Sequence, residues 1–124
     1  MTIMEAITHF DHLTHNQISV PVKVVWLSGL DGLVHREILS THKGAGPAAF
    51  SGYSADTDTD TRLLIPHPYD EIYRWYLEMK TWDTLGEMDR YNNAAQKYNM
   101  ALLTYMDYIN RNFTPIGVSG LRLV

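Results

Sequence analysis

The chain has 124 residues, a formal net charge of −4 at pH 7 and no cysteine. This length suits one domain, and we expect a packed core because 45% of the residues are apolar and only 19% are charged. The lack of cysteine excludes thiol catalysis, disulfides and cysteine-ligated zinc. The ten basic residues form no stripe, which argues against nucleic acid as a sequence-specific partner.

The first ten residues, MTIMEAITHF, contain no basic region followed by an apolar core, so we expect no signal peptide. No apolar run approaches the roughly 20 residues that a membrane-spanning helix needs. The sequence therefore predicts a soluble, intracellular, single-domain protein.

The first helix is expected from about residue 3 to about residue 13. Thr2 and Glu5 have the spacing of a capping box, in which each side chain accepts a hydrogen bond from the other residue's backbone amide. Apolar residues then recur at helical spacing and predict one buried face.

A second helix is expected after the sequence NQISVP. Pro21 suits a first helical turn, where its missing amide costs nothing. Apolar residues from Trp26 to Ile38 then recur on one face. Gly29 and Gly32 each cost a helix interior about 1 kcal/mol relative to alanine, so they require an explanation such as a close helix–helix contact.

Two further helices are expected in the second half of the chain. The third is expected to begin within PHPYDEIY. Asp70 and Glu71 would then fall in the first turn, where their negative charges interact favourably with the helix macrodipole. Gly86 separates the third helix from the fourth. In that helix six residues follow one another at intervals of 4, 3, 4, 3 and 4 positions, a spacing typical of helix-on-helix packing. They are Tyr91, Ala95, Tyr98, Leu102, Tyr105 and Ile109.

The segment between the second and third helices permits two alternatives. The runs AAFSGY and RLLIP are short, apolar and flanked by turn residues, so they could pair as a small β-hairpin with DTDTDT at its tip; a long loop is the alternative. The predicted fold is thus mostly α: a four-helix domain over residues 1–113 with this insertion, followed by an extended C-terminal tail over residues 114–124.

The repeat DTDTDT raises the question of a metal site. Asp56, Asp58 and Asp60 match the first, third and fifth positions of an EF-hand loop. However, Thr61 and His67 stand where that loop needs glycine and glutamate. We therefore favour a solvated, negatively charged turn and keep weak cation binding as the alternative.

Three histidines, His9, His12 and His15, are spaced so that they spread over about 120° of the first helix. Two of them could contribute to a zinc site only with a further carboxylate, and the sequence has no HExxH pattern. We interpret them as solvent-facing and predict no metal.

No catalytic arrangement is recognisable. Ser119 lies in GVSGL without the strand and turn of a nucleophile elbow, and the glycines of KGAGPAAFSG lack the spacing of a phosphate loop. The sequence therefore predicts no catalytic residue, no cofactor and no enzyme activity.

Aromatic residues are numerous, with eight tyrosines, three tryptophans and three phenylalanines. We expect them to exceed what a four-helix core of this size can bury. Because tyrosine and tryptophan are enriched at interfaces, the surplus predicts an oligomeric surface.

Three stretches, WLSGLDGLVHREIL, FSGYSADTDTDTRLLIPHPYDEIYRWYLEM and RYNNAAQKYN, together cover most of residues 20–112. In this combination the chain resembles small proteins that are encoded in the capsid-to-tail region of tailed-phage and prophage genomes and described as head–tail connector or adaptor proteins. The parts that carry the resemblance are Trp26-Leu27, Leu30-Asp31-Gly32, Phe50 with Gly52-Tyr53, the Asp-Thr repeat, Leu64-Ile65-Pro66, Pro68-Tyr69-Asp70 and Tyr91-Asn92-Asn93.

The resemblance implies a non-catalytic subunit of a ring, twelvefold in the particle, that lies beneath the phage portal protein and receives tail-side completion proteins. Its location would be the head–tail junction of the virion, with the host cytoplasm as the place of assembly. The insertion at residues 43–66 and the C-terminal tail would be arms that reach neighbours. The interaction residues expected on this basis are Asp56, Asp58, Asp60, Phe50 and Tyr53.

Two functions of other classes stay open at this point. One is a small helical metal-binding module or metal-dependent enzyme that uses His9, His12 and the aspartates of the repeat. The other is a prophage regulatory protein that binds a host partner.

Overall fold

The computed structural model describes residues 1–116 and contains four α-helices, as the sequence predicts. A π-helical turn, η1, continues the second helix. The elements are α1 (Ile3–Leu13), α2 (Val20–Val34), η1 (His35–Leu39), α3 (Ile72–Leu85) and α4 (Met88–Asn112).

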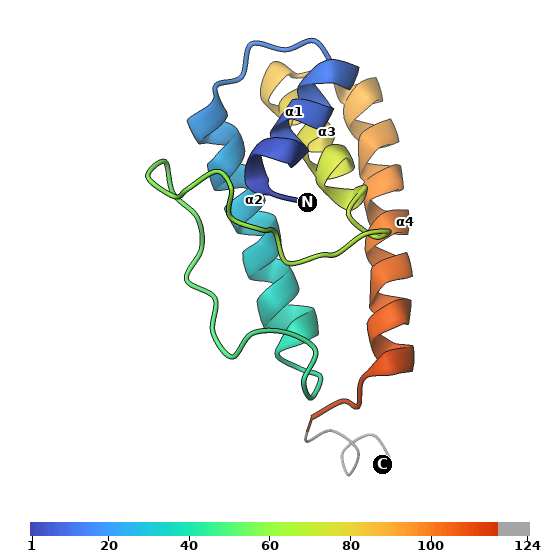
Figure 1. Ribbon diagram of the computed structural model, residues 1–124. Coiled ribbons are helices and arrows are strands. Elements are labelled where there is room, and N and C mark those ends of the chain that lie inside the picture. Colours follow the sequence, from blue (N-terminus) through green and yellow to red (C-terminus); the bar gives the residue numbers. More distant parts are fainter. Residues whose placement is uncertain (117–124) are drawn as a thin grey trace.

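Helices α3 and α4 form an antiparallel pair that makes the most extensive helix contact in the molecule. Gly86 joins them in the left-handed conformation, with φ of 73°, which glycine adopts without a Cβ clash. Helices α1 and α2 pack against α3 and against each other, so α3 lies between α2 and α4 (Figure 1).

One hydrophobic core lies where α1, α2 and α3 meet, and its buried side chains extend to the inner face of α4. On α4 the predicted seam is correct at Tyr98, Tyr105 and Ile109, whereas Ala94 is buried and Ala95 only half-buried. The side chains with essentially no exposed surface include Ile3, Ile7, Phe10, Leu27, Leu30, Val34, Ile65, Ile72, Tyr73, Leu77, Tyr105 and Ile109.

Helix α1 has the predicted capping box. The backbone amide of Thr2 donates to Oε1 of Glu5 at 2.8 Å, and the amide of Glu5 donates to Oγ1 of Thr2 at 3.1 Å. The next two amides of the helix start are satisfied from a distant segment, because those of Ile3 and Met4 donate to the carbonyls of Thr61 and Thr59, each at 3.0 Å.

The connection from Ser40 to Glu71 crosses the face of the molecule as a long loop, and no strand is formed within the described residues (Figure 1). The predicted hairpin between AAFSGY and RLLIP is therefore not formed. RLLIP instead runs beside the N-terminus, where Thr2 and Arg62 form an isolated bridge and the amide of Leu63 donates to the carbonyl of Met1 at 3.0 Å. The hydrogen-bonding partners of this segment are thus the two residues before α1, together with Asp31 and Tyr73, and not the other half of the loop.

The chain beyond α4 returns to the end of η1. Pro115 forms an isolated bridge with His42, the amide of Lys43 donates to the carbonyl of Thr114 at 2.8 Å, and the amide of Ile116 donates to Thr41 at 2.8 Å. The start of the predicted tail is therefore tied to the body of the protein. The rest of that tail, residues 117–124, lies outside the described residues.

None of the helices formed by the described residues combines the length and the apolar character that crossing a membrane requires.

Candidate functional site

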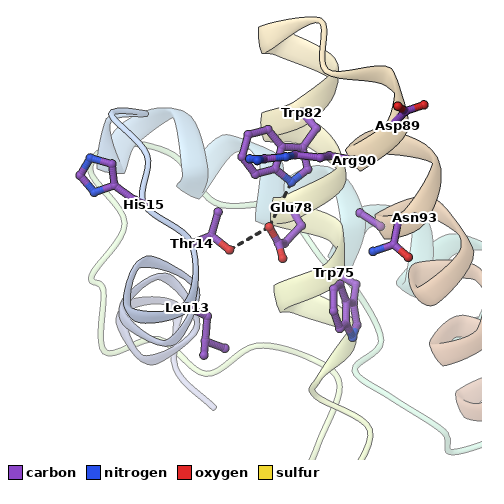
Figure 2. Close-up of a pocket in the computed structure, with 10 residues that line it drawn as sticks. Leu13, Thr14, His15, Trp75, Glu78, Trp82, Asp89, Arg90 and Asn93 are labelled. Carbon is purple, nitrogen blue, oxygen red and sulfur yellow. Dashed lines mark hydrogen bonds between the residues drawn. The ribbon is translucent and has the colours of Figure 1, made fainter.

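A hollow with a volume of about 490 Å³ lies where the end of α1 meets α3 and the start of α4. We call it the tryptophan pocket, because Trp75 and Trp82 of α3 form part of its wall (Figure 2). They are seven residues apart and therefore lie on one side of that helix. The remaining lining residues are Leu13, Thr14, His15, Glu78, Asp89, Arg90, Asn93 and Ala94.

Glu78 lies between the two tryptophans and is 92% buried. Its Oε1 accepts hydrogen bonds from the hydroxyl of Thr14 at 2.8 Å and from Nε1 of Trp82 at 3.1 Å (Figure 2). Its Oε2 lies 3.6 Å from the guanidinium of Arg74. This carboxylate is therefore engaged in holding the end of α1 against α3, and the pocket wall is fixed by it.

Cations cover the faces of both tryptophan rings. The guanidinium of Arg74 lies 4.0 Å and the ammonium of Lys97 4.6 Å from the centre of the Trp75 ring, and the guanidinium of Arg90 lies 4.7 Å from that of Trp82. Within the part of the chain that the structure describes, neither Arg90 nor Lys97 has a carboxylate in ion-pair contact. Tryptophan and arginine in partly buried positions are the residue types that dominate binding energy at protein interfaces. The pocket is suited to contact with another macromolecule.

A second cluster lies on the buried side of α2. We call it the Asp31 anchor, because its side chains and amides hydrogen-bond to the carboxylate of Asp31. Asp31 is completely buried, and its Oδ2 accepts hydrogen bonds from the hydroxyl of Tyr53 at 2.5 Å and the amide of Leu64 at 3.0 Å. Its Oδ1 accepts from the hydroxyl of Tyr73 at 2.7 Å, and that hydroxyl in turn accepts from the amide of Ile65 at 2.8 Å. One carboxylate thus joins α2, α3 and both ends of the acidic stretch of the loop.

Burial raises the pKa of the Asp31 carboxyl above its ordinary value of 3.8, and the hydrogen bonds from Tyr53, Tyr73 and Leu64 offset this only in part. Burial and then the negative charge of Asp31 raise the pKa of the Tyr73 hydroxyl well above 10.0. Burial and the hydrogen bond to Asp31 also raise the pKa of Tyr53. Both hydroxyls are therefore protonated hydrogen-bond donors at neutral pH.

The expected interaction residues Phe50 and Tyr53 are held within the chain. Phe50 is half-buried, with its ring 5.1 Å from that of Tyr53 in an edge-on arrangement and 6.1 Å from that of His35. The backbone amide of Tyr53 also donates to the hydroxyl of Ser28 at 2.9 Å. These two side chains fasten the loop to α2 and η1, and each leaves only part of its surface for a partner.

The aspartates of the repeat are exposed, whereas Thr57 and Thr59 are half-buried. Oδ1 of Asp58 accepts from the amide of Asp60 at 2.9 Å, as in an Asx turn, and Oγ1 of Thr57 accepts from the amide of Ser54 at 2.8 Å. The segment is thus a solvated turn with hydrogen bonds of its own.

The histidines of α1 and one aspartate of the repeat line a second hollow. His9, His12 and Asp60 border it, together with residues from the start of α1. No group of three or more histidine or acidic side chains in residues 1–116 is close enough to hold a metal ion. Of the three histidines expected to face solvent, His12 and His15 are exposed and His9 is half-buried.

The aromatic side chains do not form the exposed surplus that the composition suggests. All fourteen tyrosines, tryptophans and phenylalanines are buried or half-buried. Clusters within the chain accommodate them, such as Tyr69, Tyr105 and Tyr108, whose ring centres are 4.8 to 6.2 Å apart. The exposed apolar side chains are aliphatic or methionine instead.

Asp31 and Glu78 were not singled out as site residues from the sequence. A usable signal existed for Asp31, because it stands within the apolar face of a helix, three residues before Val34 and four after Leu27. A charged residue at such a position needs buried partners. Glu78 has no comparable signal, since its neighbours on α3 are mixed in polarity.

In comparisons with known proteins, no family model matches this chain, and no significant match is found among curated proteins or among solved structures.

Proposed function

We propose that this protein is a structural, non-catalytic subunit that assembles with copies of itself, and that its place of assembly is the head–tail connector of a tailed phage or prophage. The sequence resemblance supplies the connector role, the twelvefold ring and the portal and tail-side proteins as partners.

The observation that supports an assembly role is how charged and apolar side chains are distributed between the buried and exposed sides of α2. Both of its charged residues, Lys23 and Asp31, are buried, while Val20, Val22 and Val25 are exposed. A surface helix of a protein that acts alone carries its polar and charged residues outward. Exposed apolar surface on a well-packed fold is typical of protein–protein contacts.

The buried carboxylates support a structural role in a second way. Asp31 accepts two hydrogen bonds from the loop and one from Tyr73 of α3. Glu78 accepts one from Thr14 at the end of α1 and one from Trp82 within α3. Both groups stabilise the connection between segments that are distant in sequence. A loop held in this way could present a fixed surface to neighbours in a ring.

The proposal is tested by measuring the mass of the purified protein by light scattering over a wide concentration range, alone and with the portal protein of the same phage or prophage. We expect closed rings at high protein concentration or on the portal, visible in negative-stain images. A monomer that neither self-associates nor binds the portal at any concentration would contradict the proposal.

A further inference from the structure

Two cations of α4, Arg90 and Lys97, are held against α3 without an anionic partner. They are seven residues apart and therefore lie on one side of α4, about 10 Å apart along the helix axis. Arg90 reaches across the tryptophan pocket to the Trp82 ring (Figure 2), and Lys97 lies over the Trp75 ring. Within residues 1–116 neither cation has a carboxylate in ion-pair contact.

A cation that is placed over an indole ring in this way is a pre-formed site for a carboxylate. The ring attracts the positive charge but accepts no conventional hydrogen bond, so the N–H donors of Arg90 and Lys97 are available to oxygen atoms. A guanidinium also matches both oxygens of one carboxylate. Because the rings restrict the two side chains beforehand, less conformational entropy is lost when an anion binds.

Two carboxylates border the same pocket and limit how much negative charge it accepts. Glu78 is compensated, because it accepts two hydrogen bonds and lies 3.6 Å from the guanidinium of Arg74. Asp89 is exposed and has no cation in ion-pair contact among the described residues, so its charge repels an incoming anion. Removal of the Asp89 charge should therefore strengthen the binding of a carboxylate.

The Asp-Thr repeat carries carboxylates that are free to bind such a site. Asp56, Asp58 and Asp60 are exposed, and in the described part of the chain none of them has a cation in ion-pair contact. The backbone of the repeat is held in place, because Oδ1 of Asp58 accepts from the amide of Asp60 and the carbonyls of Thr59 and Thr61 accept from the start of α1. The repeat thus presents three negative charges at defined positions.

The repeat and the two cations do not meet within one chain. The repeat is bound to the start of α1, whereas the tryptophan pocket lies at the other end of α1, beside α3 and the start of α4 (Figure 1). No ion pair joins the repeat to Arg90 or Lys97 within residues 1–116. A contact between these two surfaces must therefore join two copies.

We propose that the tryptophan pocket of one copy receives the Asp-Thr repeat of the next copy, and that Arg90 and Lys97 bind its carboxylates. This contact rests on the assembly function proposed above and specifies the two surfaces that meet. Because the pocket and the repeat are different surfaces, the contact is heterologous. Each copy in a series leaves one pocket or one repeat for the next copy, and the series closes as a ring when the rotation permits.

The charges and the spacing of the two surfaces are complementary. Asp56 and Asp60 are four positions apart and can be separated by at most about 14 Å of chain. This range includes the separation of about 10 Å between the two cations, so two carboxylates of the repeat can contact both of them at once. Tryptophan and arginine, which the pocket supplies, are also enriched among the residues that dominate binding energy at interfaces.

The nature of the contact predicts that it is weak between two free copies and sensitive to salt. Exposed ion pairs contribute little individually, and salt screens them. Closing a ring, or mounting copies side by side on a portal, makes later contacts effectively intramolecular and raises the overall affinity. Oligomers are therefore expected at high protein concentration or on a portal, and they should dissociate when the salt concentration is raised.

Charge reversal on either surface tests the contact by loss and by recovery. The pocket variant carries Arg90→Glu and Lys97→Glu, and the repeat variant carries lysine in place of all three aspartates of the repeat. Each variant alone brings like charges together and should lose the oligomers of the wild type, measured by light scattering at high protein concentration and on the portal. An equimolar mixture should recover them, because the pocket of each variant then meets a repeat of opposite charge.

A matched control and milder variants show whether a loss of oligomers is specific. Lys43→Glu with Arg111→Glu makes the same change in net charge at exposed positions outside the pocket, and it should retain the oligomers. Glutamine in the pocket variant and asparagine in the repeat variant remove the charges without reversing them, and they should weaken association less than reversal does. Helix content and melting temperature, measured for every variant, identify any that fails to fold.

The exposed carboxylate at the pocket gives a prediction of the opposite sign. Asp89→Asn should shift the oligomers to lower protein concentration, because it removes the charge that repels the repeat. Asp107→Asn is the matched control, since Asp107 is an exposed aspartate of the same helix and lies ten residues beyond Lys97. An equal shift in both variants, or weaker association of Asp89→Asn, would contradict the proposed contact.

The same measurements separate failure of this contact from failure of the assembly function. Rings that persist in both charge-reversed variants would overturn the contact and leave the assembly function standing. Loss of rings in both variants without recovery in the mixture would also overturn the contact, because direct pairing of the two surfaces requires recovery. A wild type that associates neither alone nor on the portal would overturn both proposals.

Discussion

Two acidic regions of this protein have opposite roles. The Asp-Thr repeat is the conspicuous feature of the sequence, yet Asp56, Asp58 and Asp60 are exposed. Asp31 is a single aspartate in an apolar helix, and it is fully buried with three donors. The contribution of a carboxylate to the stability of the fold therefore depends on its burial and its hydrogen-bond partners, and not on how distinctive its sequence pattern is.

The largest effect should come from removing the Asp31 carboxylate. Asp31→Leu leaves the hydroxyls of Tyr53 and Tyr73 and the amide of Leu64 without their acceptor. Each unsatisfied buried donor costs about 1–3 kcal/mol, so we expect a loss of about 3 kcal/mol or more in the free energy of unfolding, measured by urea denaturation. Asp31→Asn, which retains one acceptor oxygen, should lose less. A loss below about 1 kcal/mol for Asp31→Leu would refute the anchor role.

The two tyrosines that donate to Asp31 should differ in importance. Tyr73→Phe removes a donor to Asp31 and also the acceptor of the buried Ile65 amide, so we expect a loss of about 2 kcal/mol. Tyr53→Phe removes one donor from a half-buried ring and should cost about 1 kcal/mol. Denaturation of both variants under one condition checks the order, and equal losses would show that the Ile65 hydrogen bond contributes nothing.

The pH dependence of stability should also distinguish the two acidic regions. The pKa of Asp31 is raised in the folded protein, so its protonation favours the folded state. That contribution is fully present below pH 3.8 and is lost as the pH rises through the higher folded pKa. The stability of the wild type relative to Asp31→Asn should therefore fall as the pH rises above 3.8. Denaturation at a series of pH values measures it; a flat or rising difference would contradict the raised pKa.

The smallest effect should come from the repeat itself. Replacing Asp56, Asp58 and Asp60 together by asparagine keeps the turn geometry, because asparagine can also accept the hydrogen bond that Asp58 receives from residue 60. We expect the free energy of unfolding to change by less than about 0.5 kcal/mol. Added calcium or magnesium should leave the melting temperature of the wild type unchanged. A large loss, or stabilisation by either ion, would restore the cation-site interpretation.

Local sequence patterns predicted the four helices, but α3 begins at Ile72, so Asp70 and Glu71 precede its first turn instead of forming part of it. Thr2 and Glu5 predicted the start of α1, and Gly86 predicted the break before α4, because caps and left-handed turns depend on residues only a few positions apart. The hairpin between AAFSGY and RLLIP was wrong for the converse reason. A short apolar run flanked by turn residues predicts that a segment is extended, but it does not predict which segment pairs with it. RLLIP runs beside Met1 and Thr2.

The amino-acid sequence by itself determined that the chain is mostly helical with four helices, and it determined the cap of α1 and the break at Gly86. It also determined that the Asp-Thr repeat forms a solvated turn. Only the tertiary structure decided that Asp31 receives donors from residues 22, 33 and 42 positions away, and that Glu78 joins α1 to α3. Only the tertiary structure, likewise, placed α3 between α2 and α4. The physical reason is that helix formation depends on neighbours within a turn or two, whereas burial and exposure depend on which helix faces meet in the folded chain.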